Sequence, residues 1–504
     1  MKYAALAVSF ALFFCGSFAA RAKDLEDRDW ILVRTPHFEI QSAMGEQKTM
    51  ELARHLQLVR FVTSSLTNVE SFDSPVPMRI FAFKNPRDME ELGVGGRTSG
   101  FFLPGLRRDI IVIRDAYFDW ELSALLQQYV QYLLRNQDTR LYPLWFDLGL
   151  AQYLESARIL GATASIGAIP DQEISRLPGG WIPLAKIIDH AAYEDWDGRP
   201  PVKFYGESWV LVHFLKNRPG REDTLGRDMA TYVELTGQGT GELAAFEQAF
   251  GVPSDTLDSA VRLYLQRADL LPQYYSWTLP HYTLETDVVL KDFHAETVAL
   301  TRGQASLNLG DLALNLGQLE AAERLYDIAV TDRSVEARAE AGLGDVLQFQ
   351  GKFDDALLHL QHAIDLDPDD PDCLLSYAEY WHNRARVADD EERRAEYFGR
   401  ANRYYLEASK LDDSRPETYA QYALALIDQE TDFDTALDLL EHARALAPSN
   451  DSVKLSLAQA YVRTERYEDA ARLARSVLEW SRSGSSVAGA AQKILDELPA
   501  ETAR

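Results

Sequence analysis

Cysteine is scarce in this sequence, which has only two among its 504 residues, Cys15 and Cys373. Neither a Cys-based zinc site nor a Cys-x-x-Cys redox motif can be built from them. If an N-terminal targeting segment is removed, Cys373 is left alone and cannot form an internal disulfide. Export without disulfides fits a bacterial periplasmic or secreted protein better than a small disulfide-stapled domain.

Basic residues are also few, because the chain has 51 Lys and Arg against 78 Asp and Glu, a formal net charge of −27. A nucleic-acid-binding protein needs basic surface that displaces counterions from phosphates, so this balance argues against a nucleic-acid partner. The same charge disfavours adsorption to an anionic membrane. Hydrophobic residues make up 46% of the chain, which is enough for packed cores, and the length indicates about three domains.

Long apolar runs are missing beyond the N-terminus. Met1-Lys2 precedes an apolar run from Tyr3 to Ala20, and Ala20-Arg21-Ala22 is an Ala-x-Ala cleavage site. Residues 1–22 are therefore predicted to be a signal peptide, cleaved near Ala22 to release a periplasmic or secreted protein without stable membrane insertion. The alternative is an uncleaved N-terminal membrane anchor, because about 18 apolar residues is borderline for spanning a bilayer.

The rest of the sequence divides into two parts. Residues 23–280 mix short alternating runs, such as 76–83 and 109–113, with helical patterns, which predicts an α+β domain. Residues 303–504 carry helical patterns throughout. Residues 281–302 are predicted to be a linker that packs on a neighbouring part rather than a flexible tether. We expect the fragments 23–280 and 300–504 to fold separately.

A 34-residue repeat is the strongest pattern in the second part. Leu343-Gly344, Gly351 and Ala363 recur 34 residues earlier as Leu309-Gly310, Gly317 and Ala329. This pattern resembles the tetratricopeptide repeat, in which small residues let two helices cross closely. The resemblance implies an all-α solenoid with repeats at 303–336, 337–370, 371–416, 417–450 and 451–484 and a capping helix at 486–497. The third repeat is longer, and its charge-rich stretch 387–394 is expected to lengthen the helical hairpin.

The first part resembles the peptidase-MA-like domains of gluzincin-type zinc peptidases, which often precede tetratricopeptide arrays in exported bacterial proteins. The resemblance covers roughly residues 30–270. It rests on segments that occur in the family's order, at 30–40, 99–102, 141–153, 205–215 and 245–251. It implies the gluzincin-type α+β fold.

The resemblance also points to a zinc site that this sequence does not have. In the family, a His-Glu-x-x-His helix supplies two zinc ligands and a general base, and a later Glu supplies the third ligand. The matching positions here are Gln127 and Gln131 for the two histidines, Gln128 for the base and Leu148 for the third ligand. Neutral amides are poor zinc ligands, leucine has no donor atom, and glutamine cannot take a proton from water. The resemblance therefore implies a pseudopeptidase without enzymatic activity, metal or cofactor.

A divergent metallopeptidase or hydrolase with relocated residues is the alternative function. Its candidate donors are Asp147, Glu155, Glu207, His190 and His213. We expect instead that Asp147 lies on a solvated face and that His213 is packed inside an apolar helix. A third possibility is a cell-envelope assembly factor whose inactive domain still binds a peptide strand.

The concave face of the solenoid is the expected binding surface, because positions 2, 5, 9 and 12 of each first helix face it in tetratricopeptide folds. This assignment gives the partner-binding candidates Leu307, Asp311, Leu314, Arg338, Asp345, Leu375, Glu379 and His382. Position 9 is acidic in three successive repeats. We therefore expect a protein or peptide partner that is basic or neutral and amphipathic, bound by a non-catalytic scaffold. The alternative is that these acids only keep an unfilled groove soluble.

Overall fold

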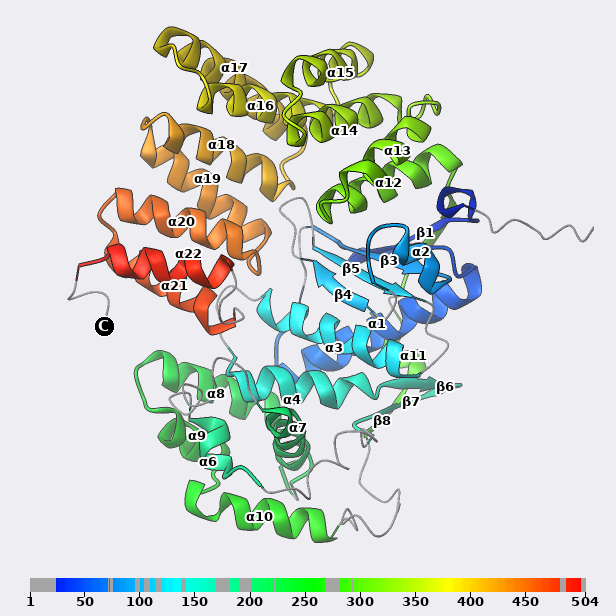
Figure 1. The fold of residues 1–504 in the computed structure, drawn as a ribbon. Coiled ribbons are helices and arrows are strands. Elements are labelled where there is room, and N and C mark those ends of the chain that lie inside the picture. Colours follow the sequence, from blue (N-terminus) through cyan, green and yellow to red (C-terminus); the bar gives the residue numbers. More distant parts are fainter. Residues whose placement is uncertain are drawn as a thin grey trace, which may run out of the picture.

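A computed structural model describes residues 24–499 except 71, 73–75, 96–99, 104–108, 115–118, 137–141, 169–180, 190–200, 219, 222, 268–281, 292 and 481–485 (Figure 1). The predicted signal peptide and His190 lie outside the described residues. The chain is mostly helical, with a mixed sheet in its N-terminal half and paired helices from residue 302 onward. None of the described helices combines the length and the apolar character needed to span a bilayer.

A six-stranded mixed sheet lies at the centre of the N-terminal half. Its strands, in the order β4-β5-β3-β2-β1-β9, are β4 (Gly100–Leu103), β5 (Ile110–Arg114), β3 (Met78–Phe83), β2 (Phe38–Ser42), β1 (Ile31–Arg34) and β9 (Glu296–Ala299). Strands β2, β3 and β5 are parallel neighbours, and the outer pairs are antiparallel. Strands β3 and β5 fall on the predicted runs 76–83 and 109–113. Apolar side chains point to both faces, as expected for strands that are covered on both sides.

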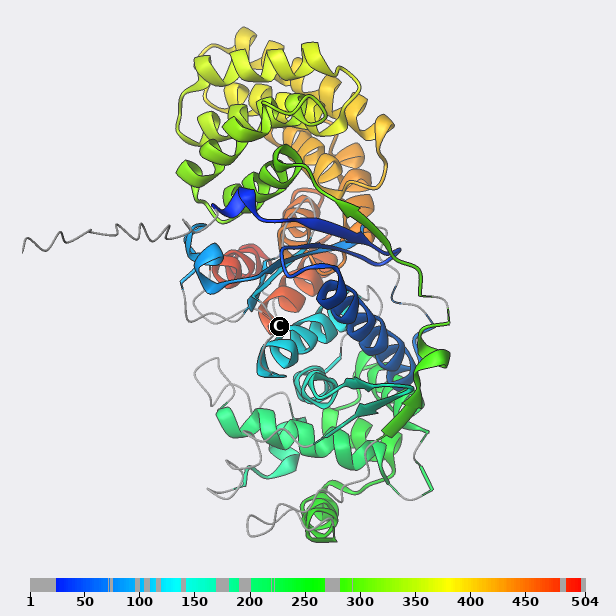
Figure 2. The ribbon, with the colours of Figure 1, turned by 90° about the vertical axis from the view of Figure 1, so that its right-hand side faces the viewer.

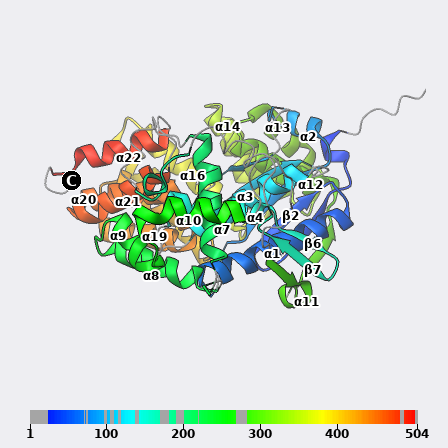
Figure 3. The same ribbon diagram turned by 90° about the horizontal axis from the view of Figure 1, so that it is seen from below.

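Helices cover one face of this sheet. Ile40, Ile80 and Ile111 pack there in one core with apolar residues of α1 (Glu46–Thr67) and α3 (Asp119–Arg135). Beyond them lie α4 (Leu144–Glu155), α6 (Leu184–Ile188), α7 (Val202–Lys216), α8 (Leu225–Gly237), α9 (Glu242–Phe250) and α10 (Ser254–Arg267). Helices α7 to α10 lie on the side of the N-terminal half away from the C-terminal helices (Figures 1 and 3). At Gly149 of α4 an added Cβ would lie 2.4 Å from the Ser208 carbonyl oxygen, so glycine lets α7 approach closely.

The segment predicted as a linker, 281–302, forms strands in two sheets. Strand β8 (Tyr282–Glu285) pairs with β7 (Thr163–Ile166), which also pairs with β6 (Arg158–Leu160), and β9 pairs antiparallel with β1. The short helix α11 (Thr286–Val289) lies between β8 and β9. These strands have only four residues each, too few for a clear alternation in the sequence. Residues 282–299 thus belong to the sheets of the N-terminal half.

Antiparallel helical hairpins make up the C-terminal array, defined here as residues 302–497. Its described helices are α12 (Arg302–Asn315), α13 (Leu319–Ala329), α14 (Glu336–Phe349), α15 (Phe353–Leu366), α16 (Pro371–Arg386), α17 (Glu391–Leu411), α18 (Pro416–Asp428), α19 (Phe433–Leu446), α20 (Asp451–Arg463), α21 (Tyr467–Trp480) and α22 (Ser486–Glu497). Close crossing depends on small residues, because an added Cβ at Gly310 or Gly342 would meet the Tyr326 ring within 2.7 Å. The third hairpin is long, with 16 residues in α16 and 21 in α17.

Helix caps start the first helices of the hairpins at defined residues. Thr301 and Gln304 form a capping box at α12. The Asp370 carboxylate accepts hydrogen bonds from two backbone amides at the start of α16, where Pro371 occupies the first turn. The Asn450 side chain accepts one backbone amide hydrogen bond at the start of α20. These caps fix where α12, α16 and α20 begin.

The first hairpins pack on the second face of the six-stranded sheet. Phe81, Phe83 and Val112 form one hydrophobic core with apolar residues of α12, α13 and α14, including Tyr326. The array then curves past the sheet from α12 to α22 (Figures 1 and 2). Ion pairs add to this contact, since Arg324 donates to Glu26 at 2.9 Å. The separate folding of the two fragments stays a prediction, and a cut near residue 300 would expose the apolar surface of this shared core.

Candidate functional site

The positions matched to zinc ligands lie on two helices that pack together. Gln127 and Gln131 are one turn apart on α3, so they share a helix face, and Leu148 is buried on α4. The Gln128 Oε1 atom is buried and has no hydrogen-bond partner among the described residues. Amide groups and a leucine side chain do not form a donor set for zinc. Across the part of the chain that the structure describes, no three His, Cys, Asp or Glu side chains are placed to hold a metal ion.

The buried acid Asp147 shows that one expectation was wrong. Asp147 is fully buried on α4, not on a solvated face, and its Oδ2 accepts a hydrogen bond from Arg135 at 2.8 Å. Burial raises the pKa of Asp147, and the Arg135 guanidinium opposes this shift. Asp147 lies in the first turn of the apolar helix α4, next to the end of α3. The sequence pattern alone does not distinguish this buried position from a solvated one. Its carboxylate ties the two helices together.

His213 and Glu207, the other relocated candidates on α7, also have structural partners. His213 is fully buried, as predicted, among Trp209, Tyr153 and Tyr264, and it forms a 2.6 Å hydrogen bond with the Tyr264 hydroxyl. Burial lowers the pKa of His213 to about 4. The buried Glu207 carboxylate accepts hydrogen bonds from the Ile182 backbone amide at 2.9 and 3.1 Å, and burial raises its pKa to about 7. These residues hold local structure.

An open cavity with a volume of about 1230 Å³ lies along the concave face of the array. We call it the groove. Five predicted candidates line it, namely Asp311, Leu314, Asp345, Glu379 and His382. Leu307 and Arg338 instead line a second cavity of about 170 Å³, where the first hairpins meet the sheet residues Val76, Arg79 and Phe81. The sheet therefore lies across one end of the concave face.

Leu375 does not face the groove. Its side chain is fully buried in a core that includes Ala341 and Ala425 on the neighbouring first helices α14 and α18. Small residues at these positions leave room between successive helices, and the leucine fills it. Leu307 is also buried, because it packs with the sheet in the shared core. Both leucines stabilise the fold rather than offer contact to a partner.

Two of the acidic candidates accept hydrogen bonds from neutral donors. The Tyr326 hydroxyl donates to Asp311 Oδ1 at 2.9 Å. Asp345 accepts from the Ser376 hydroxyl at 2.8 Å and from the Gln348 amide at 3.2 Å. Carboxylates outnumber arginines among the residues that line the groove, so its lining has a net negative formal charge.

Further groove residues were not among the predicted candidates. His382 Nε2 lies 2.9 Å from Asp428 Oδ2, and Arg386 lies 3.4 Å from the same atom. Asp428 occupies position 12 of the fourth repeat, so the repeat pattern itself could have identified it. Phe349 at the end of α14 lines the groove, and Glu417 at the start of α18 lines both cavities. Neither residue occupies position 2, 5, 9 or 12 of its repeat.

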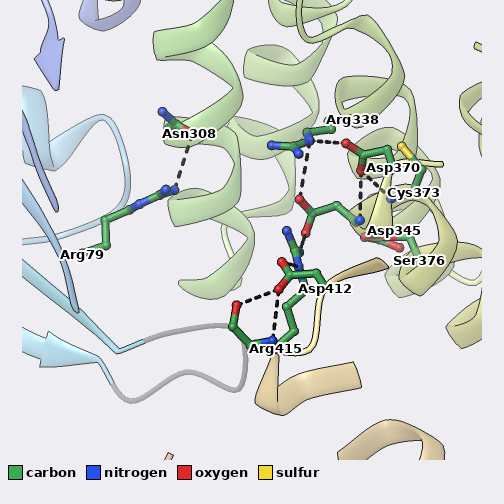
Figure 4. A network of polar contacts seen from close by, with 11 residues as sticks. Arg79, Asn308, Arg338, Asp345, Asp370, Cys373, Ser376, Asp412 and Arg415 are labelled. Carbon is green, nitrogen blue, oxygen red and sulfur yellow. Dashed lines mark hydrogen bonds and ion pairs between the residues drawn. The ribbon is translucent and has the colours of Figure 1, made fainter. Parts of the chain in front are cut away.

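Arginines at the sheet end of the concave face are engaged in a polar network (Figure 4). Arg338 Nε donates to Asp370 at 2.7 Å and lies 3.5 Å from Asp372. Arg415 pairs with both Asp372 and Asp412. This network links the first turn of α14 with the segments where α16 and α18 begin. Arg338, predicted as a partner-binding residue, here connects neighbouring repeats.

Sequence models of the tetratricopeptide repeat match residues 307–371, 341–396 and 426–494. No curated protein matches the chain. Similar solved structures include the tetratricopeptide protein TTC0263 of Thermus thermophilus, with 21% identity, 38% of this chain and 98% of that chain covered and a TM-score of 0.35. They also include pilF of Pseudomonas aeruginosa, with 21% identity, 39% and 90% coverage and a TM-score of 0.29. A third is YrrB, described as a tetratricopeptide protein with an unusual peptide-binding site, with 20% identity, 38% and 91% coverage and a TM-score of 0.27. The predicted tetratricopeptide repeats in the C-terminal part are thus confirmed.

Proposed function

We propose that this chain is an exported, non-catalytic interaction protein that binds a basic, amphipathic protein segment in the groove. Its N-terminal half is a peptidase-MA-like domain without a zinc site, which supports the array. The observation that carries the proposal is the groove itself, a large concave cavity that combines acidic and apolar side chains on the confirmed repeats.

The charge of the groove favours a basic partner. Among the described residues that line it, five are carboxylates, Asp311, Asp345, Glu379, Glu417 and Asp428, and one is a guanidinium, Arg386. Complementary charge speeds association and excludes acidic competitors. Leu314, Phe353 and Leu424 add apolar surface to the same cavity, so a segment with both cationic and apolar side chains fits best.

The absence of a usable donor set supports a non-catalytic N-terminal half. Gln127, Gln128, Gln131 and Leu148 offer neither zinc ligands nor a general base. Asp147, Glu207 and His213, which a divergent hydrolase would need, are each buried and bonded to structural partners. We infer that the N-terminal half retains the peptidase-MA-like fold without zinc ligands or a general base.

A peptide titration tests the proposed binding. An 18-residue amphipathic Lys/Leu peptide with a fluorescent label is titrated with the chain, and a Glu/Leu peptide of the same length serves as the negative control. We expect the combined changes Asp311→Asn, Asp345→Asn and Glu379→Gln to weaken Lys/Leu binding about 3- to 100-fold, at about 0.2–1 kcal/mol for each ion pair that water reaches. Asp311 and Glu379 are partly exposed and Asp345 is buried, so most of the effect should come from the first two.

The matched control neutralises three exposed acids outside the groove, through Asp355→Asn, Asp365→Asn and Asp438→Asn. This control has the same net charge as the groove variant. Equal weakening by both variants would show that the overall charge of the chain, and not the groove, attracts the peptide. Circular dichroism of each variant checks that the array remains folded.

A further inference from the structure

The groove differs at its two ends. Its first helices run from the sheet toward the open side, so their N-terminal ends lie near the sheet and their C-terminal ends lie at the far end. Arg79 of β3 and Val76, which precedes that strand, close the near end. Residues from the last turns of α14, α16 and α18 line the far end. We call this far end the mouth, defined by Phe349, Val387, Glu379 and Asp428.

Two exposed apolar side chains lie at the mouth. Phe349 is 71% exposed and Val387 is 60% exposed, and both line the groove. Large apolar side chains that lie close together in a concave site are a common mark of an interaction surface. In the long third hairpin, Val387 directly follows the end of α16. The exposed acidic stretch 389–392 comes shortly after it.

Carboxylates outnumber arginines among the residues that line the groove, five to one. At the mouth these are Glu379 and Asp428, and Asp428 is paired with Arg386 at 3.4 Å. The C-termini of α14 and α18 carry partial negative charge and have no basic residue in their last turns, whereas the last turn of α16 holds Arg384 and Arg386. At the opposite end Arg338 and Arg415 are paired with aspartates. The lining of the groove is therefore net negative, and this charge favours a cationic segment.

We propose that the partner segment docks at the mouth, with its apolar side chains on Phe349 and Val387 and its cationic side chains toward the groove carboxylates, Glu379 among them. This inference rests on the proposed function and adds the site of docking and the side chains that select the partner. A cationic amphipathic segment satisfies both features of the mouth. An acidic or purely polar segment satisfies neither.

The test uses the full chain and the Lys/Leu peptide described above. Phe349→Ala combined with Val387→Ala should weaken binding about 5- to 50-fold, because truncated apolar anchors at an interface carry much of its affinity. The matched control is Leu358→Ala combined with Leu366→Ala. Leu358 is as exposed as Phe349, at 71%, and lies on α15 outside the groove. The control should bind within twofold of the unchanged chain.

A second measurement locates the peptide directly. In a Cys15→Ser background, a fluorophore is attached at Val387→Cys or at Leu358→Cys. Cys373 does not compete, because its thiol is fully buried and burial raises its pKa. Peptide should change the emission at position 387 and leave the emission at position 358 unchanged.

The outcomes separate the two proposals. If the three groove acids matter but the Phe349 and Val387 changes do not, the groove binds the peptide and docking at the mouth is refuted. If neither set of changes affects affinity more than its matched control, the proposed function itself fails. Loss of affinity in the mouth variant together with the emission change at position 387 supports both.

Discussion

Phe81 tests whether the sheet and the first repeats form one cooperative core. This side chain lies on β3, is almost fully buried, and packs on the face of the sheet that contacts α12 and α13. Truncation of a buried phenylalanine to alanine costs about 3–5 kcal/mol through lost burial and the cavity left behind. Phe81→Ala should therefore weaken the contact between the two halves by a large part of a typical domain's stability.

Hydrogen exchange with mass spectrometry reports where this stability is lost. Phe81→Ala should speed amide exchange in α12 and α13, although the substitution lies in the N-terminal half. The matched control is Phe38→Ala on the opposite face of the same sheet, where Phe38 packs on Tyr129 with ring centroids 6.2 Å apart. Its effect should concentrate in α1 and α3. Unchanged protection of α12 and α13 in Phe81→Ala would refute the shared core.

Three further predictions concern metal, packing and pH. Purified protein should hold no stoichiometric zinc by mass spectrometry, and chelator-sensitive proteolysis that co-purifies with it would contradict the pseudopeptidase proposal. Gly342→Ala should destabilise the array by about 1–3 kcal/mol in urea unfolding, because the added methyl group overlaps the Tyr326 ring; an unchanged midpoint would show that the ring can move aside. Because folding lowers the pKa of His213, the free energy of unfolding decreases as pH falls from 6.5 to 4. Because folding raises the pKa of Glu207, the free energy of unfolding decreases as pH rises from 4.5 to 7. Glu207→Gln should leave the histidine unopposed, so that relative to the unchanged chain its unfolding free energy falls by about 2 kcal/mol more between pH 6.5 and 4.5; parallel curves would refute this assignment.

The array was predictable because its repeat fixes local and neighbouring contacts together. Gly310 and Gly344 recur in phase, and each makes room for a side chain of the second helix at the same repeat position, the Tyr326 ring for Gly310 and Leu360 for Gly344. Asp311, Asp345 and Glu379 share one position of that repeat, and they line one cavity in the structure. In a solenoid, sequence spacing translates directly into position on a face.

Features that depend on distant segments were not predictable in this way. Leu375 occupies a position that the repeat assigns to the groove, but small residues on both neighbouring helices draw it into the core. The buried Asp147 has a partner twelve residues away, Arg135, that no local pattern identifies. The docking of the sheet on α12 joins segments more than two hundred residues apart, as in the contact of Arg79 with Asn308. Such contacts are set by shape and burial across the whole chain.

The most direct test of the central claim is photo-cross-linking of the Lys/Leu peptide, carrying a benzophenone group, to the full chain, followed by mass spectrometry of the linked fragments. The account predicts cross-links to the groove-lining parts of α12, α14, α16 and α18, concentrated around Phe349 and Val387. Excess Glu/Leu peptide should not reduce them. Cross-links that fall mainly on α13, α15, α17 and α19, or on the N-terminal half, would contradict it.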